Sequence, residues 1–293
     1  MVGLYGDSPL GSYATPQSVA AITLDHVRNW YQQLFRPNDA VFMVSGDITV
    51  AHGRKLAGKL LAGWEPGPQP EADYRTPPEP PRRTIILVDR PEGRQSTVRL
   101  GLRAYDVYND DKFAGALASQ VLSSGIDSRL GRYVRAQKGL AYSVWGGFRP
   151  GRHGGSFVAG TDTTIARTAD AVAAMFQVFD DMRHNPVTDR ELSEAKLRVS
   201  GAMVMSMQTV ESQAGFRVDG VLNGYPIDYY DRYPARVGAV SLEQVRQVMD
   251  HYVRHDVADP LVVVVVAPAA QVRAQLERLG EVRVVPMPGR EAK

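Results

Sequence analysis

Arg135 and Tyr142 lie seven residues apart in the segment GRYVRAQKGLAYSVWGGF, which joins a basic helical stretch to an alternating strand. Both side chains donate hydrogen bonds, and such donors can stabilise an oxygen atom on which negative charge develops. They also have a purely structural interpretation, in which Arg135 complements the helix C-terminus and Tyr142 packs on the sheet. The residues alone favour the structural interpretation, so a chemical role needs support from the rest of the chain.

The other residues with metal-binding or nucleophilic chemistry give weaker patterns. His251 and His255 are spaced i, i+4 in HYVRH, but no glutamate accompanies them, and we expect a surface pair. The lack of cysteine excludes disulfides, thiolate metal sites and a cysteine nucleophile. The absence of a Gly-x-Ser-x-Gly turn disfavours an α/β-hydrolase. We therefore predict no metal site and no cofactor site in this chain.

Charge and hydropathy set the general class of the protein. The 293 residues carry a net charge of +2 with interspersed signs, which gives no reason to expect nucleic-acid binding. The longest apolar run, residues 261–267, is far shorter than the roughly 20 residues of a membrane-spanning helix. The first residues do not form a signal-peptide pattern. The compartment stays open between the cytoplasm and, in a bacterium, the periplasm or cell envelope.

Hydrophobic periodicity and turn residues predict strands and helices joined by hairpins rather than by regular βαβ units. This order favours an α+β fold, a two-layer α/β sandwich with helices packed on a largely antiparallel sheet. Helices are expected over residues 23–35, 51–64, 110–124, 128–138, 165–185 and from 188 onward, and strands over 40–47, 83–91, 95–105, 140–148 and 155–164.

A proline-rich linker divides the chain. Residues 65–83 hold seven of the 19 prolines, and such a stretch resists helix and sheet and acts as a semi-rigid spacer. It separates a leading segment, residues 1–64, from a body at residues 84–293 whose length suits one domain.

An internal repeat relates the two parts. The segment SLEQVRQVMDHYVR, from Ser241, resembles TLDHVRNWYQQLFR, from Thr23, with an offset of 218 residues. In both parts an apolar strand and a helix follow, and three elements in the same order favour duplication. With this offset about 135 residues of the first repeat have no place in the chain. Residues 1–64 are therefore interpreted as the tail of a first unit that is homologous to the complete unit 84–293, and the chain is a fragment or its missing half is supplied separately.

Three segments are similar to one known family. The stretch SSGIDSRLGRYVRAQKGLAYSVWGGF resembles the most recognisable second-half segment of the insulinase, pitrilysin and mitochondrial processing peptidase family of zinc metallopeptidases, the inverted zincins. YQQLFRPNDAVFMVSGDIT resembles the segment that closes the first half, and TDRELSEAKLRV resembles the long helix late in each half. The resemblance implies a fold like that of LuxS and the processing peptidases, with homologous α+β halves that close over a peptide substrate.

The resemblance also implies what this chain lacks and what it supplies. The family binds zinc in its first half through an inverted His-x-x-Glu-His helix, and FAGALASQVLSS resembles the metal-free counterpart of that helix. Zinc is therefore expected in a missing half or partner and not in this chain. In the family an arginine and a tyrosine of the second half reach the substrate, and their positions match Arg135 and Tyr142. A guanidinium and a phenolic O–H there would stabilise the oxyanion of the tetrahedral state.

Two functional hypotheses follow. In the first, the chain is the C-terminal half of a zinc metalloendopeptidase that binds peptide and is inactive without a zinc-bearing half or partner subunit. In the second, the chain is a non-catalytic partner or scaffold subunit of the same fold. In both, residues 1–64 lack sheet partners, so we expect exposed apolar surface there, with self-association or poor order.

Overall fold

The computed structural model describes residues 2–6, 8–38, 40–68, 70, 74–80 and 82–287. The chain divides into two compact units, which are considered separately. Unit 1 comprises residues 1–13, 74–199 and 235–293, and unit 2 comprises residues 14–73 and 200–234. Two helices, α7 (Asp189–Ser206) and α9 (Tyr229–Ala239), cross the boundary between the units.

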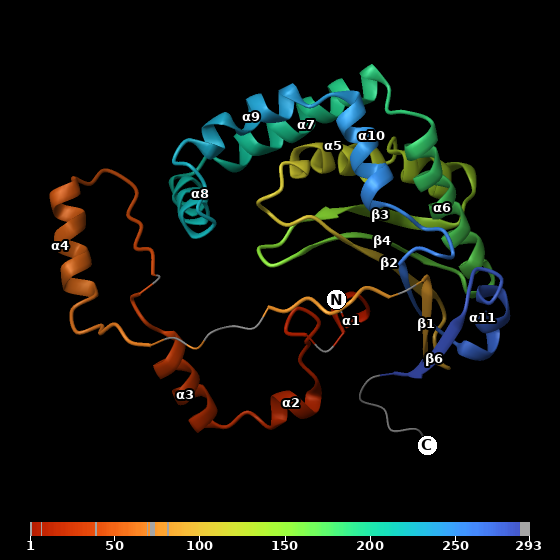
Figure 1. The fold of residues 1–293 in the computed structure, drawn as a ribbon, viewed down its shortest axis with the longest axis horizontal. Helices are drawn as coiled ribbons and strands as arrows, with labels where there is room; N and C mark the ends of the chain where they lie inside the picture. Colours follow the sequence, from red (N-terminus) through yellow and green to blue (C-terminus); the bar gives the residue numbers. More distant parts are fainter. Residues whose placement is uncertain are drawn as a thin grey trace. The chain divides into compact units, whose positions relative to one another are not determined.

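Unit 1 is built on a six-stranded sheet with the strand order β3-β4-β2-β5-β1-β6 (Figure 1). The pairings of β3 with β4, β4 with β2 and β2 with β5 are antiparallel, whereas β1 runs parallel to both β5 and β6. This largely antiparallel sheet with its helical layer confirms the predicted α+β class. The strands are β1 (Thr84–Asp89), β2 (Ser96–Ala104), β3 (Ala141–Arg149), β4 (Gly155–Thr163), β5 (Val262–Ala267) and β6 (Val282–Pro286).

Helices cover one face of this sheet, and Figure 1 shows α5, α6 and α10 together on that side. α5 packs on β3, α6 packs on β2 and β4, and α10 packs on α5 and α6. The core between the layers consists of fully buried apolar side chains such as Leu100, Leu117, Phe157, Met175, Phe179 and Met249. The helical segments of unit 1 are α1 (Val2–Tyr5), α5 (Asp111–Ser123), η1 (Gly131–Gln137), η2 (Ile165–Arg167), α6 (Thr168–His184), α10 (Leu242–Tyr252) and α11 (Ala269–Leu276).

Helix α1 packs against β2 and β5. Leu4 and Tyr5 are buried with Val262, and the Tyr5 hydroxyl donates a hydrogen bond to the Gly155 carbonyl at 2.8 Å. Arg103 Nε donates to the Leu4 carbonyl at 2.8 Å. The start of the chain is thus part of unit 1.

Unit 2 contains α2 (Pro16–Ala20), α3 (Leu24–Leu34), α4 (Val50–Leu60) and α8 (Val210–Leu222). The expected helix 23–35 is confirmed, with Thr23 as its N-cap. The strand expected over residues 40–47 is wrong, because this stretch pairs with no strand and bends at Gly46 and Asp47. A strand satisfies its backbone groups only beside a neighbouring strand, and the described residues offer this stretch none.

Candidate functional site

Arg135 lies in η1 (Gly131–Gln137), a π-helix, which is wider than the α-helix expected over residues 128–138. In η1 the Lys138 N–H donates to the Tyr133 carbonyl at 3.0 Å, an i to i−5 bond that defines a π-helical turn. Such turns often occur at functional sites. Gly139 then adopts a φ of +58°, as expected for a residue just past a helix end, and the chain enters β3.

Arg135 and Tyr142 lie in contact. The guanidinium carbon of Arg135 is 4.8 Å from the centroid of the Tyr142 ring, within the range of a cation–π interaction. The pairing of β3 with β4 shifts register between Ala141 and Val144, so Tyr142 sits in a β-bulge. Bulges re-aim side chains, and Tyr142 is 84% exposed, whereas Arg135 is half-buried. The two donors are therefore held together at the surface, with the phenol facing solvent.

Side-chain hydroxyl groups form hydrogen bonds with the backbone of β3, the strand that carries Tyr142, and with the residue just before it. Thr163 Oγ1 donates to the Leu140 carbonyl at 2.6 Å, and Thr161 Oγ1 donates to the Ser143 carbonyl at 2.7 Å. On α5, Ser119 Oγ accepts the Phe148 N–H at 2.9 Å. These bonds fix β3 on both sides of the bulge, so the position of Tyr142 is set by the sheet and by α5.

A buried arginine ahead of η1 is a structural residue that the sequence did not reveal. The Arg129 side chain is only 9% exposed and contacts Asp181 at 2.9 Å and Glu191 at 2.8 Å. It also donates to the backbone carbonyls of Asn185 and Pro186. Through these contacts Arg129 ties the residues ahead of η1 to the corner between α6 and α7.

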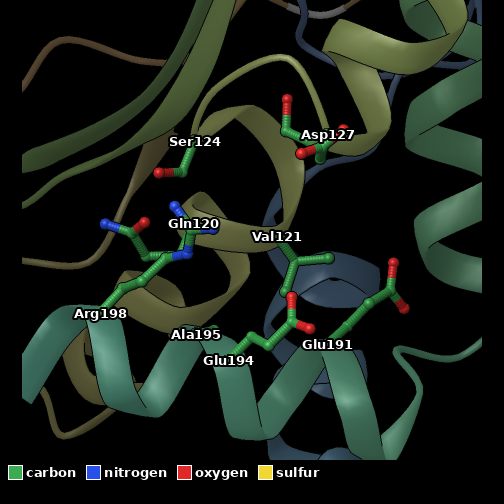
Figure 2. A pocket seen from close by; sticks show the side chains of 9 residues that line it. Gln120, Val121, Ser124, Asp127, Glu191, Glu194, Ala195 and Arg198 are labelled. Atoms are coloured by element: carbon green, nitrogen blue, oxygen red, sulfur yellow. The ribbon is translucent and has the colours of Figure 1, made fainter.

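A small pocket lies between α5, the following loop and α7, and Figure 2 shows Gln120 and Arg198 at one end and Asp127 and Glu191 at the other. Glu191 is already bound by Arg129. Within the part of the chain that the structure describes, no group of three or more His, Cys, Asp or Glu is placed to hold a metal ion. The pocket is lined by Gln120, Val121, Ser124, Asp127, Ser128, Glu191, Glu194, Ala195 and Arg198.

The expected surface pair of histidines is wrong for His255. α10 ends at Tyr252, so the chain turns and the His255 side chain enters the core, where the residue is 4% exposed. Its Nε2 lies 3.3 Å from Asp180 Oδ2, and its ring lies 4.9 Å from that of Phe176. His251 stays exposed. Neither histidine belongs to the Arg135 site.

No helix among the described residues is both long and apolar enough to cross a lipid bilayer.

Comparison with known proteins identifies a matching family model and several relatives. Residues 21–199 match the family model of the peptidase M16 inactive domain. An uncharacterised zinc protease of Mycobacterium tuberculosis is 24% identical over 258 residues, which make up 86% of this chain and 58% of the relative. The non-peptidase homolog YmxG of Helicobacter pylori is 23% identical over 249 residues, 83% of this chain and 56% of the relative.

The fold of this chain also resembles that of solved structures. The crystal structure of a peptidase M16 inactive domain from Pseudomonas fluorescens superposes with a TM-score of 0.81 at 24% identity, covering 91% of this chain and 63% of that chain. The chain thus spans little more than half the length of the curated relatives described above.

Proposed function

Because the chain belongs to the family of peptidase M16 inactive domains, we propose that it is the metal-free, substrate-binding half of a zinc metalloendopeptidase. In this function Arg135 and Tyr142 donate hydrogen bonds to the backbone of a bound peptide. The zinc belongs to a separate half or partner subunit, and the chain alone does not hydrolyse peptides.

The contact between Arg135 and Tyr142 is the observation that carries this proposal. The Arg135 guanidinium in η1 and the Tyr142 ring on the bulged strand β3 lie 4.8 Å apart and form a preorganised pair of donors, and the exposed phenol is accessible to a ligand. Preorganised donors stabilise developing negative charge because they need no rearrangement during the reaction. Peptide carbonyls occur at every residue, so such a pair positions a peptide without reading its side chains.

The test uses a fusion protein. The part of the M. tuberculosis relative that lies outside its alignment with this chain is joined to the N-terminus of this chain, and peptide hydrolysis and zinc content are measured. Arg135→Ala and Tyr142→Phe should each lower kcat by about 10²–10³-fold without changing the zinc content. Arg132→Ala, in the same π-helical turn, and Tyr108→Phe, another exposed tyrosine, are the matched controls and should leave kcat within about twofold. Zinc binding or hydrolysis by the unfused chain would contradict the proposal.

A non-catalytic scaffold is the second candidate function, and the name of the H. pylori relative favours it. A scaffold uses the fold for assembly, so Arg135 and Tyr142 would then have no reacting oxygen to bind. If the fusion hydrolyses peptides equally well with Arg135→Ala and Tyr142→Phe, the scaffold function replaces the first proposal.

A further inference from the structure

The face of the sheet opposite the helical layer carries a cluster of two arginines and a tryptophan. The strand register sets Arg99 of β2 beside Gly160 of β4, and Gly160 beside Trp145 of β3, so these residues form one row across three strands. Val98 and Leu100, the neighbours of Arg99 in β2, are buried, so the Arg99 side chain points away from the core. The cluster therefore lies on the face that α5, α6 and α10 leave open (Figure 1).

Gly160 makes room for this row. A Cβ at this position would lie 2.7 Å from Arg99 Cδ and 2.9 Å from Trp145 Cζ2, closer than ordinary van der Waals contact. The guanidinium carbon of Arg99 lies 5.3 Å from the centroid of the Trp145 ring. The guanidinium carbon of Arg149, at the end of the same strand as Trp145, lies 5.1 Å from this ring. One aromatic ring thus holds two cations through cation–π contacts.

Both guanidinium groups keep hydrogen-bond donors that the described part of the chain does not use. Arg149 is exposed and forms no hydrogen bond or ion pair with a described residue. Arg99 donates through Nη1 to two backbone carbonyls, whereas its Nε and Nη2 meet no acceptor among the described residues. The nearby carboxylate of Asp162 lies 3.8 Å from Arg99 and already accepts a hydrogen bond from a threonine of β2. The cluster therefore has an excess of positive charge and free donors.

Arg103, a third arginine on this face, shows what a purely structural role looks like. Its guanidinium donates to the backbone carbonyls of Leu4 and Pro77. A structural arginine here thus uses its donors on the chain itself. Arg149 has no such contact among the described residues, so its donors are available to a ligand.

We propose that Arg99 and Arg149, arranged around Trp145, form a subsite for an acidic side chain of the bound peptide. A guanidinium that lies over an aromatic ring keeps its in-plane N–H groups, and these can bind a carboxylate through two parallel hydrogen bonds. This inference rests on the proposed function and adds to it a substrate class, peptides that carry glutamate or aspartate near the bond to be cleaved.

The subsite lies on the strand that also carries Tyr142. Trp145 and Arg149 follow Tyr142 in β3 at about 10 Å and about 23 Å along an extended strand. An extended peptide has the same rise per residue, so an acidic residue about three to seven positions from the carbonyl at Tyr142 would reach the cluster. Acidic residues at this separation should therefore strengthen peptide binding.

Fluorescence anisotropy of labelled probes tests the subsite in the unfused chain. The probes are a peptide with a run of glutamates, the same peptide with glutamine in place of each glutamate, and a single-stranded DNA oligonucleotide of equal charge. We expect the glutamate peptide to bind at least about tenfold more tightly than the glutamine peptide, and added salt should reduce this difference.

Substitutions locate the binding. Arg99→Gln and Arg149→Gln should each weaken binding of the glutamate peptide by about threefold to tenfold. Arg149→Gln carries the test if Arg99→Gln does not fold, because Arg149 is exposed and has no structural hydrogen bond among the described residues. Arg278→Gln is the matched control, since Arg278 is exposed, follows α11 and has no carboxylate partner there either. It should change the affinity by less than about twofold.

Three results in the unfused chain would overturn the subsite. They are equal binding of the glutamate and glutamine peptides, an effect of Arg278→Gln as large as that of Arg149→Gln, and DNA binding as tight as that of the glutamate peptide. The last result would show a general polyanion site and not a peptide subsite.

The fusion with the M. tuberculosis segment separates this inference from the proposed function. Its kcat/KM should be about tenfold higher for the glutamate peptide than for the glutamine peptide. Arg149→Gln should abolish this preference, and Arg278→Gln should retain it. If the fusion hydrolyses both peptides equally well, the subsite is refuted and the proposed function stands. If it hydrolyses neither, although the unfused chain binds the glutamate peptide through Arg99 and Arg149, the subsite is supported and the proposed function is refuted.

Discussion

Arg129 donates two parallel hydrogen bonds to Glu191, from Nε to Oε1 at 3.0 Å and from Nη2 to Oε2 at 2.8 Å. This bidentate geometry is the strongest form of an arginine–carboxylate contact. Glu191 also accepts the Thr188 N–H at 3.0 Å, which completes the capping box at the start of α7. One carboxylate thus holds the beginning of α7 and the segment ahead of η1, and it thereby helps to position Arg135.

Replacing Arg129 should destabilise the protein strongly. Arg129→Met leaves Glu191 and Asp181 without their buried partner, and we expect a loss of about 3–5 kcal/mol in the free energy of unfolding. Urea denaturation followed by circular dichroism measures it. Arg132→Met is the matched control, because Arg132 is 52% exposed and reaches Glu191 only at 3.4 Å, so its loss should stay below about 1 kcal/mol. Equal losses of unfolding free energy in the two variants would show that the buried contact of Arg129 with Glu191 stabilises the protein no more than the exposed contact of Arg132.

The stability of the protein should depend on pH through Glu191. Burial alone would raise the pKa of this carboxyl, but hydrogen bonds from Arg129 and Thr188 outweigh burial and lower the pKa from 4.5 to about 2. Because the folded-state pKa is the lower one, the stabilisation is complete above about pH 4.5 and is lost as the pH falls toward 2.

The difference in unfolding free energy between the wild type and Glu191→Gln measures this effect. It should shrink by about 2–4 kcal/mol between pH 6 and pH 2. Glu194→Gln serves as the control, since Glu194 is half exposed and pairs with the exposed Arg190. A difference for Glu191→Gln that stays constant with pH would rule out the lowered pKa.

Gly139 should resist substitution. Its φ of +58° is left-handed backbone, which costs other residues about 1–2 kcal/mol. Gly139→Ala should therefore lower the melting temperature. Gly238→Ala in α9 is the opposite case, because a Cβ there meets nothing within 4 Å and the backbone is helical, so it should raise stability by up to about 1 kcal/mol. Differential scanning calorimetry of both variants checks the contrast, and a neutral Gly139→Ala would contradict the proposed strain.

The apolar face of α3 is uncovered, with Val27, Trp30 and Tyr31 51–61% exposed, and should drive self-association of the isolated chain. Val27→Glu combined with Trp30→Glu places two charges on this face and should shift the chain toward monomer. Asn29→Glu combined with Gln33→Glu adds the same charge on the polar face and should change association little. Sedimentation velocity at several concentrations distinguishes the two pairs. A parent chain that is monomeric at all concentrations would remove the basis for this prediction.

Local signals in the sequence predicted much of the secondary structure. The helices expected from residues 23 and 188 begin there with capping hydrogen bonds at Thr23 and Thr188, because such a bond involves only residues three apart. The hairpin of β3 and β4 forms across the glycine-rich turn for the same local reason. Arg135 and Tyr142 were predicted to lie at one helix-to-strand junction, and the structure has η1 followed by β3 there.

Other features depended on partners distant in the sequence. Arg129 is buried because Asp181 and Glu191, more than fifty residues away in the sequence, neutralise its charge. His255 enters the core because its ring contacts Asp180 and Phe176 there. Residues 40–47 form no strand because pairing needs a neighbour, whatever the local propensity.

The sequence by itself predicted the repeat, the starts of the helices at Thr23 and Thr188 and the two candidate donors, since each of these predictions rests on short segments. The tertiary structure alone decided that Tyr142 on a bulged strand touches Arg135 of η1, that a buried arginine anchors the segment ahead of them, and that the face of α3 stays uncovered. These three features arise from packing, and packing is settled only when every partner is in place.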